Sequence, residues 1–94
     1  MTENQMQLLK HIASHYGFSQ QAEIAIEECA ELIMALQKLK RGKPNIDNIA
    51  EEIADVLIMA EQLKYLYGSD IIDRIITQKL QRQIRRINNY YLKY

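Results

Sequence analysis

The stretch from Ile49 to Ala60 constrains the fold most, because it is apolar on almost every side. Its only polar residues are Glu51, Glu52 and Asp55. Wound as a helix, this stretch has no broad polar face to turn towards water, so other helices must cover it nearly all round. An ionised carboxylate under such a cover needs a cation, a basic side chain or a proton. The sequence therefore predicts a helical protein in which Glu52 and Asp55 require a partner.

Helix signals divide the chain into four segments, and no segment alternates with the period of a strand. Each segment begins at a residue that can cap a helix, and the first three end near a glycine. The first begins at a capping box, Thr2 with Gln5 three residues on. The expected caps are Thr2, Ser19, Asn45 or Asp47, and Ser69 or Asp70, and the expected ends are Gly17, Gly42 with Pro44, and Gly68.

The connections between these segments are short, about three to seven residues, which favours successive helices that lie antiparallel as neighbours. The expected fold is a single all-α domain over residues 1–94, a four-helix antiparallel bundle. A chain of this length buries only about two-thirds of its unfolded surface as a monomer. The apolar third segment also has more surface than the chain's own helices can cover. We therefore expect a homodimer or homotetramer, with ligand pockets near the subunit junction.

Two acidic pairs occupy corresponding places on the second and third segments. Residues three apart share a helix face, so Glu28 and Glu31 point the same way, and so do Glu52 and Asp55. If the two helices pack antiparallel, the four carboxylates can converge, and they then repel one another unless a cation lies among them. The pattern predicts a metal site with oxygen ligands, which favours Mg²⁺, with Mn²⁺ as a substitute. Neither pair contains the Glu-x-x-His of di-iron bundles, which argues against redox iron.

The last segment is basic and carries no acidic residue after Asp73. Lys79, Gln83 and Arg86 share one face of it. A substrate that a divalent cation bridges to carboxylates, and that lysine and arginine hold from the other side, is a polyphosphate. The acidic and basic halves of the charge pattern thus predict a single site.

Two other interpretations use the same residues. In one, the chain is a non-enzymatic helical interaction module, and Arg82, Arg85 and Arg86 neutralise the acids. In the other, the basic helix binds nucleic acid, but the chain has 12 basic and 12 acidic residues, and its acidic centre would repel a phosphate backbone. A nucleic-acid partner is therefore not expected.

The paired motifs resemble a known family. Glu27-Glu28-x-x-Glu31, a spacer of twenty residues, and then Glu52-x-x-Asp55 are similar to the signature of the all-α nucleoside triphosphate pyrophosphohydrolases, the MazG-like superfamily. Tyr16-Gly17 before the first motif and the apolar residues 56–59 after the second are also similar, and the resemblance spans about residues 8 to 87.

The resemblance implies a hydrolase that cleaves nucleoside triphosphates between the α and β phosphates with Mg²⁺, giving a monophosphate and pyrophosphate. House-cleaning of the nucleotide pool is the expected role, and control of dUTP or dCTP and a phage-like or stress role are the alternatives. The positions that match imply metal ligation by Glu28, Glu31, Glu52 and Asp55, a water-orienting role for Glu27, and substrate binding by Lys79, Gln83 and Arg86. The chain departs from the family at two positions. Gln83 stands where the family often has asparagine, and Asn48 stands where some members have lysine.

The expected location is the cytoplasm. Cys29 is the single cysteine, which excludes an internal disulfide and suits a reducing compartment. Its place on an apolar helical stripe predicts a core thiol. No apolar run is long enough to span a bilayer, and the polar start of the chain does not resemble a signal peptide.

Overall fold

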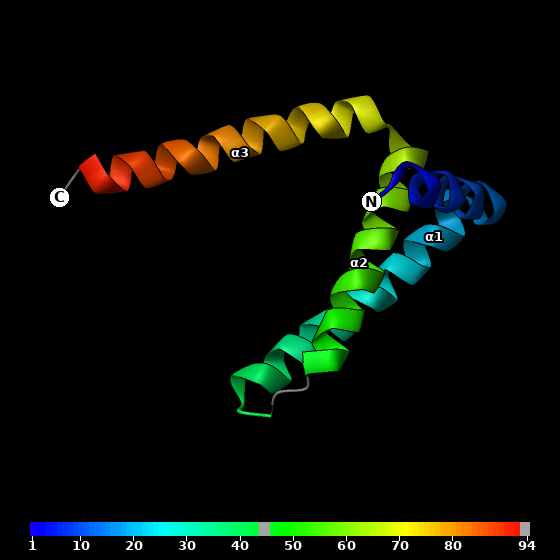
Figure 1. Cartoon of the computed structure of the whole chain (residues 1–94), viewed down its shortest axis with the longest axis horizontal. Coiled ribbons are helices and arrows are strands. Elements are labelled where there is room, and N and C mark those ends of the chain that lie inside the picture. The colour runs from blue at the N-terminus through cyan, green and yellow to red at the C-terminus, as the bar shows by residue number, and fades with distance from the viewer. Residues whose placement is uncertain (44–45, 93–94) are drawn as a thin grey trace.

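A computed structural model describes residues 1–43 and 46–92, and these residues form helices with short connections (Figure 1). The helices are α1 (Glu3–Lys40), α2 (Ile46–Tyr67) and α3 (Ser69–Leu92). The described residues include no strand, which confirms the all-α class.

Helix α1 begins at the predicted capping box and bends at Gly17. The Gln5 N–H donates to Thr2 Oγ1 at 3.1 Å, and the Thr2 N–H donates to Gln5 Oε1 at 2.9 Å. At Gly17, φ is 81° and ψ is 169°, a conformation that glycine adopts far more readily than other residues. The helix resumes directly after Gly17, so Ser19 lies inside α1 and does not cap a separate segment.

The end of α1 is a Schellman motif around Gly42, which has a φ of 76°. The Lys43 N–H donates to the Lys38 carbonyl at 3.0 Å, and the Gly42 N–H donates to the Leu39 carbonyl at 3.1 Å. The predicted stop at Gly42 is therefore confirmed. The other signals predicted for this connection, Pro44 and Asn45, lie outside the described residues, and Asp47 lies within α2.

Beyond the bend, residues 18–40 of α1 run antiparallel beside α2, to which the short connection joins them (Figure 1). Small side chains at Ala25 and Ala35 are buried on the α1 side of this seam, and Met59 is buried on the α2 side. The part of α1 before the bend lies against the later part of α2. Leu9 and Ala13 are buried there.

Helix α3 leaves the other two helices after Gly68 and extends away from them (Figure 1). An ion pair of 2.6 Å between Lys64 Nζ and Asp73 Oδ1 spans this junction. Within the described residues, the chain does not form the expected four-helix antiparallel bundle. The physical reason is the connection: one non-helical residue separates α2 from α3, whereas bundle connections that reverse the chain usually take two to eight residues.

Much apolar surface stays uncovered in a single chain. The accessible surface is 7718 Å², which is about 2,000 Å² more than the roughly 5,700 Å² of a compact monomer of 11.1 kDa. The radius of gyration, 16.6 Å, compares with about 12.4 Å for a compact domain of this length. Cys29, expected in the core, is exposed. Ile53, Leu57 and Ile58 are exposed too, so one chain covers the 49–60 stretch only in part.

Candidate metal centre

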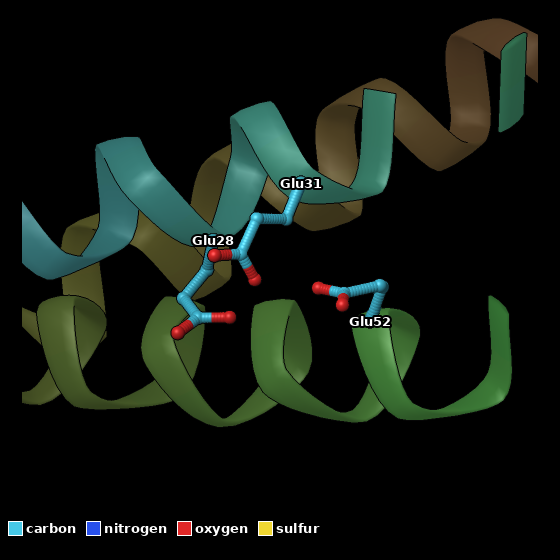
Figure 2. A group of neighbouring side chains, drawn as sticks. All are labelled: Glu28, Glu31 and Glu52. Atoms are coloured by element: carbon cyan, nitrogen blue, oxygen red, sulfur yellow. The ribbon is translucent and has the colours of Figure 1, made fainter. Parts of the chain in front are cut away.

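Three of the predicted ligands meet in the seam between α1 and α2. Glu28 and Glu31 extend from α1 and Glu52 from α2, and Figure 2 shows their carboxylates in the space between the two helices. One carboxylate oxygen of each residue lies within 4.8 Å of those of the other two. Of the four carboxylates predicted to converge, Glu28, Glu31 and Glu52 do so, and Asp55 lies outside this group.

The spacing of residues on α1 explains why Glu28 faces α2. Gln21, Ala25 and Ala35 are buried on the side of α1 that packs on α2. Glu28 follows Ala25 by three residues and precedes Ala35 by seven, so it falls on the same face. Glu31, three residues on from Glu28, lies at the edge of this face and is exposed.

The cluster contains carboxylate oxygens that no described group satisfies. Glu28 and Glu52 are half-buried. Oε2 of Glu28 and Oε2 of Glu52 are themselves buried and have no hydrogen-bond partner in the described part of the chain. Buried acceptors are nearly always paired with a protein group, a water or an ion. These two oxygens therefore mark a place that a water, an ion or a shared proton has to satisfy.

Electrostatics at the cluster disfavour the ionised form of two acids. Burial raises the pKa of Glu28 above its ordinary value, and the nearby Asp55, Glu31 and Glu52 raise it further. Burial also raises the pKa of Glu52, and Glu31, Asp55 and Glu51 add to the rise. A divalent cation among these groups would reverse the effect, because it stabilises the ionised form of each carboxylate that binds it.

Asp55 and Glu27 stand at the margin of the cluster. Asp55 is half-buried and acts on both Glu28 and Glu52, which places it beside the three converging carboxylates. Glu27 is exposed on α1, one turn before Glu31. The close group comprises Glu28, Glu31 and Glu52, so metal ligation by Asp55 and the water-orienting role of Glu27 stay predictions.

The basic residues of α3 do not reach the acids within one chain. Lys79, Gln83 and Arg86 are exposed on α3, which projects from the other helices and does not pack on α1 (Figure 1). The arginines that would neutralise the acids in an interaction module lie on the same helix. Among the described residues, the ion pairs involve Lys64 with Glu61 and Asp73, and none joins a basic side chain to the cluster.

Two glutamines that the sequence reading did not single out extend the polar seam. Gln21 and Gln62 are each only 2% exposed, and Oε1 of Gln21 is buried without a hydrogen-bond partner in the described residues. Gln21 precedes Glu28 by seven residues and Gln62 follows Asp55 by seven. The antiparallel register that sets Glu28 near Asp55 therefore sets the two amides opposite each other. The sequence signal that could have found the two glutamines is this equal spacing, because each lies two helical turns from an acid of the cluster.

A cavity of about 330 Å³ opens next to this seam, between the first part of α1 and α2. Its walls are mostly apolar, and Gln62 also lines it. Ala54 is part of the lining, whereas none of the acids of the cluster is.

Comparison with known proteins gives one match. The family model described as the MazG nucleotide pyrophosphohydrolase domain matches residues 17–88. This range holds α1 from the bend onwards, all of α2 and most of α3, and it includes every residue predicted for the site. No curated protein and no solved structure matches the chain. None of the described helices has the length and apolar character that crossing a membrane requires.

Proposed function

Since the chain belongs to the MazG nucleotide pyrophosphohydrolase domain family, we propose that it is a Mg²⁺-dependent nucleoside triphosphate pyrophosphohydrolase. It cleaves the bond between the α and β phosphates and releases a nucleoside monophosphate and pyrophosphate, in a house-cleaning role. The observation that carries this proposal is the group of Glu28, Glu31 and Glu52, whose carboxylate oxygens lie within 4.8 Å of one another.

The residues present fit Mg²⁺ well. All candidate donors are carboxylate oxygens, the ligands that hard divalent cations prefer, and the same set accepts Mn²⁺. Two of those oxygens, on Glu28 and Glu52, are buried without a described partner. Glu28, Glu31, Glu52 and Asp55 would hold the ion. Bound there, Mg²⁺ would neutralise the triphosphate and polarise the phosphorus that is attacked.

The chain's own side chains supply the other parts of the reaction. Glu27 is exposed one turn from Glu31, where its carboxylate can orient the attacking water and accept its proton. Lys79 and Arg86 bind phosphate oxygens and stabilise the charge that develops on the departing pyrophosphate. Gln83 lies on the same face of α3 and can donate a further hydrogen bond.

A second copy of the chain is needed to bring these α3 residues to the acids. The apolar side of α3 is exposed, with Leu80 at 55% and Ile84 at 57%. The uncovered excess of about 2,000 Å² per chain corresponds to about 4,000 Å² for a pair, which is within the range of obligate homodimers. The protein is therefore proposed to be a homodimer or homotetramer, in which α3 of one copy serves the acids of another.

Hydrolysis of a nucleotide panel tests the proposal. Purified protein with Mg²⁺ is incubated with canonical and modified nucleoside triphosphates, and pyrophosphate and monophosphate are measured. We expect both products from at least one nucleotide, and a loss of at least about a hundredfold in kcat/KM in Glu52→Gln. Glu23→Gln is the matched control, because Glu23 is an exposed acid of α1 that is not among the three converging carboxylates. Absence of pyrophosphate from every nucleotide, or full activity in Glu52→Gln, would contradict the proposal.

A further inference from the structure

We propose that a second copy of this chain packs on one particular side of the α1–α2 pair, the side away from the exposed acids of the site. We call this side the apolar face. It is formed by six residues, Ile26, Cys29, Ile33 and Leu36 of α1 with Ile53 and Ala60 of α2. A second copy is already part of the proposed function, on which this inference rests to that extent. What is added here is the surface through which the copies meet.

On α1, the apolar face and the acids lie on opposite sides of the seam. A helix turns by about 100° per residue, so Cys29 lies about 100° round α1 from Glu28 in one sense, and Glu31 lies about 60° from Glu28 in the other. Ile26 and Ile33 flank Cys29 at spacings of three and four, which places them in the same stripe. All three are exposed. The stripe is therefore on one side of Glu28, and Glu31 is on the other.

Helix α2 repeats this arrangement. Ile53 lies about 100° round α2 from Glu52, and Asp55 lies about 60° from Glu52 in the opposite sense. Because the two helices run antiparallel, the same sense of rotation leads to the same side of the seam on both. Ile53 and Ala60, seven residues on, are both exposed. The pair of helices therefore has an apolar side and an acidic side.

Charge decides which of these two sides can meet an identical copy. In a twofold pair, each surface packs against the same surface of the partner. None of the six residues of the apolar face is Asp, Glu, Lys, Arg or His, so two such faces meet without repulsion. The other side carries Glu27, Glu31 and Asp55, and like charges that face each other across an interface are unfavourable. A second copy therefore fits the apolar face and not the acidic side.

The surface that one chain leaves uncovered is large enough for such a pair. The excess over a compact monomer is about 2,000 Å² per chain. Stable monomers rarely expose apolar patches of more than a few hundred Å². Obligate homodimers bury roughly 2,000–5,000 Å² in total, a range that includes twice this excess. The area thus agrees with a second copy as the occupant of the face.

The apolar face continues to the junction of α2 and α3. A cavity of about 420 Å³ opens there, and its lining includes Phe18, Ala60, Tyr67, Ile72 and Ile76. From Ile76, the exposed Leu80 and Ile84 follow at spacings of four along α3. A second copy on the apolar face can therefore also cover the apolar side of α3. Helix α3 of each copy then lies along the other copy, as the proposed shared site requires.

Two neighbouring residues of α1 provide a matched test. Ile33 belongs to the apolar face, whereas Met34 follows Glu27 by seven residues and Glu31 by three and so lies on the acidic side. The two side chains are 56% and 54% exposed. Ile33→Glu places a carboxylate from each copy in an apolar interface, so light scattering should give the 11.1 kDa of one chain. Met34→Glu should keep the larger mass of the unchanged protein. An unchanged mass in Ile33→Glu, or equal dissociation by both variants, would overturn the proposal.

Cys29, the single cysteine, reports on the same face without any substitution. This measurement covers the case in which Ile33→Glu does not fold, as judged by circular dichroism. We expect Ellman's reagent to react with Cys29 of the unchanged protein at least about a hundredfold more slowly than with the chain unfolded in guanidinium, because the second copy covers the thiol. Dilution that dissociates the oligomer should restore fast reaction. An oligomer whose thiol reacts as fast as that of the unfolded chain, or a monomer whose thiol is protected, would show that the proposal is wrong.

These measurements separate the apolar face from the proposed function, because neither mass nor thiol reaction needs a nucleotide or a metal. If no nucleotide is hydrolysed but Cys29 is protected in an oligomer that Ile33→Glu dissociates, the proposed function fails and the face stands. If nucleotides are hydrolysed by a monomer, or by an oligomer with a reactive Cys29, the face fails and the activity stands.

Discussion

Magnesium should stabilise this fold by an amount that can be calculated from mass action. A ligand that binds only the folded protein, at ten times its dissociation constant, adds about 1.4 kcal/mol to the free energy of unfolding. For a domain of this size, that corresponds to a rise in Tm of roughly 6–11 °C. The measurement is a thermal melt by circular dichroism with and without millimolar Mg²⁺. Protein concentration is held constant, because the stability of an oligomer depends on it.

The substitution Glu52→Gln should have two opposite effects in this assay. Without metal, Glu52 is half-buried beside Glu31 and Asp55, and burial and these like charges raise its pKa. A neutral amide at this position removes that unfavourable charge, so the metal-free variant should melt at a higher temperature than the unchanged protein. With metal, the variant has lost a ligand, so the rise produced by Mg²⁺ should largely disappear. Glu23→Gln, an exposed change outside the cluster, should alter neither value.

The opposite pattern would refute the reasoning. If basic side chains of another subunit neutralise the acids, then Glu52→Gln breaks an ion pair and lowers the Tm without metal. Mg²⁺ would then leave the melting of the unchanged protein where it was. That pair of results would favour the interaction module over the metal enzyme.

Three further predictions follow from the charges and from the position of α3. Without metal, the difference in Tm between Glu52→Gln and the unchanged protein should be small below pH 4.5, the ordinary pKa of the carboxyl group. It should grow as the pH rises through the raised pKa of Glu52, because the folded state holds this proton more tightly than the unfolded chain. A difference in Tm that does not change with pH would contradict this prediction. Light scattering at micromolar concentration should give a mass above the 11.1 kDa of one chain. Mixing inactive Lys79→Ala with inactive Glu52→Gln should restore part of the activity. In a mixed pair, one site has the intact acids of the Lys79→Ala copy and the intact α3 of the Glu52→Gln copy. A stable monomer, or no recovery of activity, would show that the sites are not shared between copies.

The local features of the fold were predictable because neighbouring residues decide them. Thr2 and Gln5 form their capping box within one turn, and Gly42 ends α1 through hydrogen bonds to its last turn. The meeting of Glu28 with Glu52 was also predictable, since it needs only two helices and a short connection. Helical spacing sets the face that each acid occupies.

The features that were missed depend on distant groups or on a single backbone angle. The predicted ends at Gly17 and Gly68 are confirmed as breaks in the helical backbone, but the local pattern does not show that a helix resumes directly after Gly17 or that α3 extends away from the other two helices. Gln21 and Gln62 are of a residue type that usually lies at the surface, and only the packing of α1 on α2 buries them. Cys29 is exposed because the helices of a single chain do not cover the part of α1 that carries it.

The bend at Gly17 divides α1 into two parts with different neighbours. The part before it lies against the later part of α2, where Leu9 and Ala13 are buried, and the part after it carries Glu28 and Glu31 to the acidic cluster. At a φ of 81°, a side chain at position 17 would be strained. A substitution of this glycine would therefore disturb the angle between the two parts, although it lies outside the cluster.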